Sequence, residues 1–327
     1  MGLLVDGKWQ DKWYDTDSTG GKFERDAAQF RNFVTADGSA GPTGDSGFKA
    51  EPDRYHLYVS LACPWAHRTL IFRQLKGLQD MIDVSVVDYL MAEHGWTFQA
   101  SEQQDKDLIK DKINDFELMH QVYTKANAEY SGRVTVPVLW DKKQQTIVSN
   151  ESADIIRMFN SAFDDVGATT ADYFPAALHS KINDINDRVY SDINNGVYKA
   201  GFATKQEVYE KEVAKLFKAL DWVDKILANN RYLTGDDITE ADWRLFTTLI
   251  RFDAVYHGHF KCNLKRIVDY PNISCYLREL YQIKGVSDTI NLRHIKHHYY
   301  LSHANINPNG IVPYGPELDF DSAHGRE

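Results

Sequence analysis

Apolar positions in the first half of the chain alternate between strand-like runs and helical spacing. A buried strand is predicted over residues 56–61, and apolar residues then recur at helical spacing over 65–75. A second strand is predicted at 84–87. After a polar segment, the same reasoning predicts a helix near 116–128, strands over 134–140 and 146–148, and a capped helix over 153–159.

The order of these elements is strand, helix, strand, helix, strand, strand, helix, which predicts a thioredoxin-like domain. Parallel strands need a helical crossover, whereas an antiparallel pair can be joined by a hairpin, so this order gives a small mixed sheet with helices on both faces. We expect this α/β domain to span residues 51–165, with the polar stretch at 93–115 inserted into it.

The second half of the chain has a different pattern, because strand signals fade past Pro175 and long helical periodicities replace them. An all-helical domain is therefore predicted over 175–310. Thr239 and Asp242 have the spacing of a capping box, in which each side chain satisfies the other's backbone amide. The predicted helices cover 178–194, 205–229, 240–256 and 273–281.

The two ends of the chain carry no comparable periodicity. Residues 1–50 are rich in Gly, Asp, Ser and Thr, and are expected to form an extended N-terminal arm. Residues 311–327 are expected to form a C-terminal tail.

Composition narrows the choice of partners and compartment. The formal net charge is -10, and the 37 Lys and Arg residues are scattered, so a nucleic-acid partner is not expected. The N-terminus turns polar too early for a signal peptide, and no stretch approaches ~18 uninterrupted apolar residues, so no membrane association is expected and the cytoplasm is the predicted location. Three cysteines, an odd and sparse set, suit free thiols in a reducing compartment.

Cys63 is the strongest candidate for chemistry, because it stands where the first predicted strand ends and the first helix begins. Unpaired amides and the helix dipole at that junction favour thiolate over thiol, and Pro64 suits the first helical turn. The alternative, that Cys63 is a small core residue, is less favoured in this setting. Cys262 and Cys275 lack the setting, so we assign them structural roles.

The predicted active site contains a single sulfur, because Ala66 occupies the place that a resolving thiol would take in a Cys-x-x-Cys motif. A mixed disulfide on Cys63 can then be released only by an outside thiol. Glutathione is the abundant cytosolic candidate, so it is expected as co-substrate.

Two further segments are predicted to anchor glutathione. Val136-Pro137 begins the third strand, and a cis proline there would leave the valine backbone free to pair with an extended peptide; a trans proline on a strand edge is the alternative. Glu151 and Ser152 at the following helix start offer a carboxylate for an ammonium group and donors for a carboxylate. Simple helix capping would also explain them.

Histidines gather in two places, but neither set has zinc-motif spacing, so no metal is expected. The first set comprises His257 and His259 with Cys262. The second comprises His294, His297, His298 and His303.

With these residues in view, the sequence resembles the glutathionyl-hydroquinone reductases, the xi class of glutathione transferases, over essentially its whole length. The resemblance implies glutathione-transferase architecture and a homodimer. It rests on the segments Ser60-Leu61-Ala62-Cys63-Pro64-Trp65-Ala66-His67-Arg68, Gly95-Trp96-Thr97, Ser131 to Trp140, Ser149-Asn150-Glu151-Ser152, Asn194 to Phe202, and His298-Tyr299.

The resemblance also implies roles for individual residues. It makes Cys63 the nucleophile, Tyr198 a proton donor or acceptor, and Tyr256 with Tyr299 hydroxyls that lower the thiol pKa. Glutathione would contact Trp96, Arg133, Val134, Thr135, Val136, Glu151 and Ser152.

The expected reaction is attack of the Cys63 thiolate on the glutathione sulfur of a glutathionyl-hydroquinone bound between the domains, followed by release of oxidised glutathione by a second glutathione. An omega-like thioltransferase or dehydroascorbate reductase is the enzymatic alternative. A non-catalytic ligand-binding module of the same fold is the other alternative.

Overall fold

The computed structural model describes residues 2–101 and 105–326, and these form two compact units built from non-contiguous segments. Unit 1 comprises residues 1–13, 26–171 and 289–298, and unit 2 comprises 14–25, 172–288 and 299–327. Within the described residues, no helix combines the length and the apolar character that crossing a membrane requires.

Unit 1 is organised around a four-stranded mixed sheet in the order β4-β3-β6-β7. Strand β3 (Tyr55–Val59) pairs in parallel with β4 (Asp83–Val86) and antiparallel with β6 (Val138–Asp141), which pairs antiparallel with β7 (Thr146–Ser149). Every residue of β3 and β6 is buried, as expected for central strands covered on both faces.

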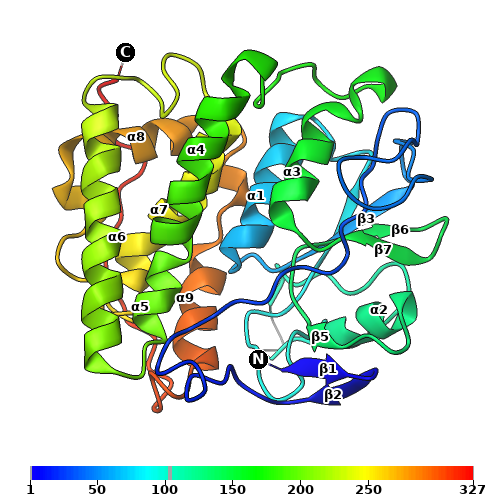
Figure 1. Ribbon diagram of the computed structural model, residues 1–327, viewed down its shortest axis with the longest axis horizontal. Helices are drawn as coiled ribbons and strands as arrows, with labels where there is room; N and C mark the ends of the chain where they lie inside the picture. The colour runs from blue at the N-terminus through cyan, green and yellow to red at the C-terminus, as the bar shows by residue number, and fades with distance from the viewer. Residues whose placement is uncertain (1, 102–104, 327) are drawn as a thin grey trace. The chain divides into compact units, whose positions relative to one another are not determined.

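Three helices accompany this sheet. Helix α1 (Pro64–Leu75) packs beside α3 (Ser152–Ser161), whereas α2 (Met119–Ala126) contacts β7 (Figure 1). A short 3-10 turn, η1 (Asp164–Val166), follows α3. The predicted thioredoxin-like domain is confirmed by this arrangement.

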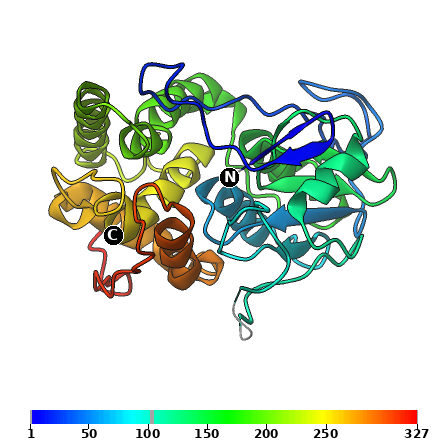
Figure 2. The same ribbon diagram turned by 90° about the horizontal axis from the view of Figure 1, so that it is seen from below.

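A second, three-stranded sheet in unit 1 was not predicted from the sequence. Strands β1 (Leu3–Val5) and β2 (Lys8–Gln10) form a hairpin, drawn in dark blue in Figure 1 and Figure 2, and β1 pairs with β5 (Gly132–Arg133). Strands this short give no periodic signal. Their pairing also joins residues far apart in the chain.

The strand predicted over 134–140 begins later in the structure. Pro137 has no amide hydrogen to donate to a ladder, and regular pairing with β3 starts at Val138. Residues 134–136 therefore form an irregular segment between β5 and β6.

Unit 2 is helical, which confirms the predicted all-α half. Its main helices are α4 (His179–Val189), α5 (Gly196–Gly201), α6 (Gln206–Leu227), α7 (Glu240–Arg251) and α8 (Pro271–Gln282), and the division between the units falls within α9 (Leu292–Ser302). Single π-helical turns, Tyr190–Asn194 and Phe252–Tyr256, extend α4 and α7. Short 3-10 turns are η2 (Ala176–Leu178), η5 (Ile267–Asp269) and η6 (Ser287–Thr289).

The predicted capping box at the start of α7 is present. The Thr239 amide donates to an Asp242 carboxylate oxygen at 2.8 Å, and that carboxylate also accepts from the Leu233 amide at 3.0 Å and the Tyr276 hydroxyl at 2.8 Å. Burial raises the pKa of Asp242, while these donors oppose the rise. The box thus ties α7 to α8 and to the loop before it.

Candidate active site

Cys63 is the N-cap of α1, with the extended backbone angles φ -75° and ψ 121°. Its carbonyl accepts the first helical hydrogen bond from the His67 amide at 3.0 Å, and Pro64 fills the first helical position. The side chain is half-buried. The sulfur therefore stands at the positive end of the helix dipole, where a thiolate is stabilised.

The Cys63 sulfur contacts the segment that leads into β6. Because β6 pairs with β3, the residues before β6 meet the end of β3, and the Cys63 thiol donates to the Val136 carbonyl at 3.4 Å. The Val136-Pro137 peptide is cis. The Val136 carbonyl thus accepts a hydrogen bond from the thiol. The Val136 amide has no hydrogen-bond partner among residues 2–101 and 105–326.

The other residues of this segment are held by their surroundings. The Tyr123 hydroxyl donates to the Thr135 carbonyl at 2.8 Å and accepts from the Thr135 amide at 3.2 Å. Val134 is buried. The Arg133 guanidinium donates to the carbonyls of Lys12 and Trp13, so its side chain is engaged with the N-terminal segment.

Glu151 and Ser152 lie at the start of α3, as expected. Glu151 is the N-cap of α3, and its Oε1 accepts from the Ala153 amide at 2.9 Å. At least one of its carboxylate oxygens therefore caps the helix. Ser152 is buried, and its hydroxyl accepts from the Arg68 guanidinium at 3.4 Å. Arg68, itself buried and 4.5 Å above the Trp65 ring, places a positive charge beside this helix start.

Trp96 is 4% exposed and lies in the polar insertion of unit 1. Its ring stacks on His298 with centroids 4.8 Å apart, and His298 Nδ1 lies 2.8 Å from the Tyr89 carbonyl. The Trp96 carbonyl accepts from the Met119 amide at 2.9 Å. Trp96 is thus fixed through both its ring and its backbone.

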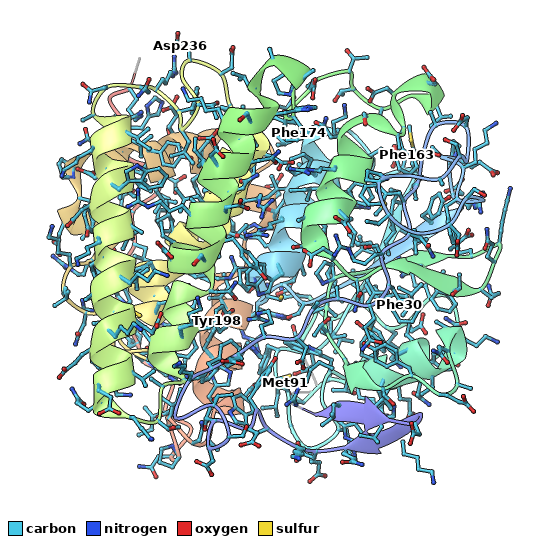
Figure 3. The ribbon with its side chains drawn as sticks, viewed as in Figure 1. Phe30, Met91, Phe163, Phe174, Tyr198 and Asp236 are labelled. Carbon is cyan, nitrogen blue, oxygen red and sulfur yellow. The ribbon has the colours of Figure 1, made fainter. Side chains whose placement is uncertain are left out.

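Unit 2 brings together the three tyrosines named from the resemblance. Tyr198 lies on α5 (Figure 3), Tyr256 ends the second π-helical turn and Tyr299 lies on α9. The Tyr299 hydroxyl is 2.5 Å from that of Tyr198 and 2.9 Å from that of Tyr256. Burial raises the pKa of Tyr256 and Tyr299 well above the usual range, so both remain neutral donors near neutral pH.

The Tyr198 ring has cationic and aromatic neighbours in the arm segment of unit 2. The Arg25 guanidinium lies 5.2 Å from the Tyr198 ring centroid and its Nε donates to the Asn195 side chain at 3.2 Å. Phe23 stacks on the same tyrosine at 6.2 Å. Arg25 and Phe23 went unnoticed in the sequence, where nothing distinguishes them from the rest of a polar arm.

The candidate residues thus fall into one set in each unit. Unit 1 holds Cys63 and the proposed glutathione contacts, and unit 2 holds the hydroxyl chain of three tyrosines.

One group of potential metal ligands is present in the described part of the chain: Asp105, Asp107 and His294. His294 Nε2 lies 3.0 Å from Asp105 Oδ2, and Arg293 Nη1 lies 3.4 Å from Asp105 Oδ1. The Asn291 side-chain nitrogen Nδ2 donates to Asp107 Oδ2 at 2.8 Å. The nitrogen atoms of Asn291, Arg293 and His294 contact the two carboxylates, and this polar cluster joins the insertion to the start of α9.

Both parts of the chain match known family models. Residues 62–162 match the model for the N-terminal domain of glutathione S-transferase, and residues 206–279 match the model for its C-terminal domain.

Curated relatives share most of the chain. The chain is 59% identical to the glutathionyl-hydroquinone reductase YqjG of Escherichia coli, over 100% of this chain and 99% of the relative. It is 54% identical to the glutathionyl-hydroquinone reductase PcpF of Sphingobium chlorophenolicum, over 97% and 96%. A glutathione S-transferase omega-like 2 of Schizosaccharomyces pombe is 46% identical over 92% and 96%.

Solved structures agree with these matches. The glutathione-bound structure of Escherichia coli YqjG superposes with a TM-score of 0.92 at 55% identity, covering 99% of each chain. The xi-class glutathione transferase of Natrialba magadii gives 0.90 at 47% identity, covering 100% of this chain and 96% of the other.

Proposed function

Because the chain belongs to the glutathionyl-hydroquinone reductases, the xi class of glutathione transferases, we propose that it reduces glutathionyl-hydroquinones to hydroquinones with glutathione as co-substrate. The observation that carries the mechanism is a lone thiol at a helix N-terminus, with an alanine where a second thiol would stand.

In the first step, the Cys63 thiolate attacks the sulfur of the glutathionyl-hydroquinone. A sulfur-sulfur bond forms, the bond between sulfur and the aromatic carbon breaks, and that carbon takes a proton from Tyr198. The hydroquinone leaves, and Cys63 is held as a mixed disulfide with glutathione. Neutral Tyr256 and Tyr299 are proposed to donate hydrogen bonds that favour the thiolate.

In the second step, a glutathione thiolate attacks the mixed disulfide. Oxidised glutathione is released and Cys63 returns as a thiolate, and the proton that the second glutathione loses replaces the one that Tyr198 gave up. Over the whole cycle, two electrons pass to the aromatic carbon from two glutathione sulfurs, that of the conjugate and that of the incoming thiol.

We propose that glutathione binds beside Cys63 through residues of unit 1. The Val136 amide, which lacks a hydrogen-bond partner among the described residues, would pair with the peptide backbone, and Glu151 would face the ammonium group. Ser152 would contribute a donor for the glutamyl carboxylate. Trp96 and residues 133–135 complete the proposed contacts.

The test replaces the nucleophile and compares it with another thiol of the chain. Cys63→Ser should lower turnover of glutathionyl-menadiol by on the order of a thousandfold or more, because a serine hydroxyl cannot form the mixed disulfide. Cys275→Ser is the matched control and should keep wild-type turnover. Undiminished activity of the Cys63 variant would refute the assignment.

A second candidate function is suggested by the 46% identity to a glutathione S-transferase omega-like 2. An omega-like thioltransferase would reduce a simple mixed disulfide or dehydroascorbate faster than the quinone conjugate. Comparing kcat/KM for glutathionyl-menadiol and for hydroxyethyl disulfide with glutathione distinguishes the two, and we expect the conjugate to be preferred.

We also propose a homodimer and a cytoplasmic location. Sedimentation should then give twice the chain mass of 37.5 kDa. The cytoplasmic location follows from the need for reduced glutathione in the second step, and cell fractionation tests it.

A further inference from the structure

The N-terminal hairpin of unit 1 reaches the backbone of the segment that precedes the proposed glutathione contacts. Strand β1 pairs with β5 through Leu3 opposite Arg133 and Leu4 opposite Gly132. Beyond the end of β1, the Gly7 amide donates to the Tyr130 carbonyl at 3.1 Å. The hairpin therefore acts as an added edge strand for residues 130–133.

The hairpin reaches the Trp96 region through one side chain, Trp9. Its indole nitrogen donates to the Glu93 carbonyl at 2.9 Å, and its ring stacks on His120 with centroids 5.0 Å apart and planes inclined by 17°. Both partners belong to unit 1 and lie more than 80 residues away in the sequence.

Two glycines make room for this indole. A Cβ atom on Gly95 would lie 2.6 Å from Cη2 of Trp9, and one on Gly2 would lie 2.3 Å from Cζ2. Gly95 also has a φ of 70°, which side-chain-bearing residues rarely adopt. The ring thus fills the space that side chains at positions 2 and 95 would take.

The turn that Trp9 supports leads directly into Trp96. The Gly95 amide closes the turn on the Ala92 carbonyl at 3.0 Å, and the next residue, Trp96, is held by His298 and by the Met119 amide. Trp9 therefore acts on the chain immediately before Trp96. His298 and α2 act on Trp96 itself.

We propose that the N-terminal hairpin positions the glutathione-binding segments of unit 1, and that Trp9 is its positioning residue. This inference rests on the proposed function, because it takes Trp96 and residues 133–136 as glutathione contacts. Trp9 positions these glutathione contacts and takes no part in the reaction at Cys63.

The first experiment measures binding of S-methylglutathione, which cannot react, by calorimetry. Trp9→Phe keeps an aromatic ring and removes the donor to Glu93, so the dissociation constant should rise roughly three- to tenfold. The KM for glutathione should rise in parallel while kcat stays within about twofold, and Cys63 should be alkylated by iodoacetamide at the wild-type rate.

The matched control is Trp222→Phe on α6 of unit 2, a tryptophan covered by the Arg188 guanidinium at 4.1 Å. It should bind S-methylglutathione as the wild type does. Wild-type affinity in the Trp9 variant, or an equal loss in both variants, would overturn the inference.

A second measurement uses the unaltered protein and does not depend on the folding of any variant. Saturating S-methylglutathione should slow amide hydrogen exchange in residues 3–10 as well as 93–97, and should leave α8 unchanged. If the ligand does not change amide exchange in the hairpin, the inference is wrong. If wild-type protein binds S-methylglutathione but does not reduce glutathionyl-menadiol, the proposed function is wrong, and the exchange result still tests the role of the hairpin in binding.

Discussion

At the scale of single residues, the Tyr198 hydroxyl is proposed to donate the proton that the aromatic carbon takes up. It lies 2.5 Å from the Tyr299 hydroxyl, and a phenylalanine in its place would keep the ring packing while removing the proton. We expect Tyr198→Phe to lower kcat for glutathionyl-menadiol about a hundredfold. Stopped-flow release of the hydroquinone measures the affected step.

The control for this variant is Tyr190→Phe, because Tyr190 is 40% exposed and lies outside the hydroxyl chain. It should retain wild-type kcat. A Tyr198 variant that releases hydroquinone at the wild-type rate would leave the proton to another donor.

His56 makes a residue-scale prediction about pH. Burial lowers the pKa of His56 to about 4, and its Nε2 lies 2.9 Å from the Ser85 hydroxyl on the neighbouring strand. The unfolded chain has an ordinary histidine pKa near 6.5, so between pH 6.5 and 4 it binds a proton that the folded protein lacks. Stability should therefore fall as the pH drops through this window, by about 3 kcal/mol from His56.

Urea unfolding at several pH values measures this dependence. His56→Gln, which removes the titrating group, should flatten the slope between pH 6.5 and 4, whereas His94→Gln, at an exposed histidine, should leave it unchanged. Equal slopes in the two variants would assign the acid sensitivity to other groups.

At the scale of elements, the start of α7 concentrates stability in one buried carboxylate. Asp242 accepts hydrogen bonds from Leu233, Thr239 and Tyr276, so its removal leaves several buried donors without a partner. We expect Asp242→Ala to lower the free energy of unfolding by about 3 kcal/mol. Asp236→Ala, at an exposed position of the preceding loop (Figure 3), should change it by less than about 0.5 kcal/mol in the same urea titration.

Elements with a local signal could be predicted from the sequence. Helix α1 and the capping box of α7 depend on neighbours within a few residues, and both are present. Helices α5 and α9 were not predicted, and neither was the second sheet. Their formation depends on partners elsewhere in the chain.

The candidate site divides in the same way. The position of Cys63 at the N-terminus of α1 could be predicted from the sequence, because a strand pattern precedes it and Pro64 and a helical pattern follow it. The contact of its sulfur with Val136 depends on the pairing of β3 with β6. Arg68 beside Ser152 also required the packing of α1 against α3, which no short segment records.

At the scale of the whole molecule, ligand binding at the proposed glutathione site should raise the free energy of unfolding. A ligand that binds only the folded protein stabilises it by about 2.7 kcal/mol at a concentration 100 times its dissociation constant. Thermal unfolding with S-methylglutathione should show the corresponding rise in midpoint, and Cys63→Ser should keep it because the proposed contacts remain. A chain that melts at the same temperature with and without the ligand would argue against this binding site.

The pairing of Leu3 with Arg133 also has a consequence for biosynthesis. The two residues are separated by about 130 positions, and at ribosomal speeds of about 5–20 residues per second the first waits roughly 6 to 26 seconds for the second. Strand β1 therefore leaves the ribosome well before β5 and stays without this partner until β5 has been made. A purification tag fused ahead of Gly2, which lies against Trp9, would have to be accommodated beside this pairing, so it should be removed before the binding measurements.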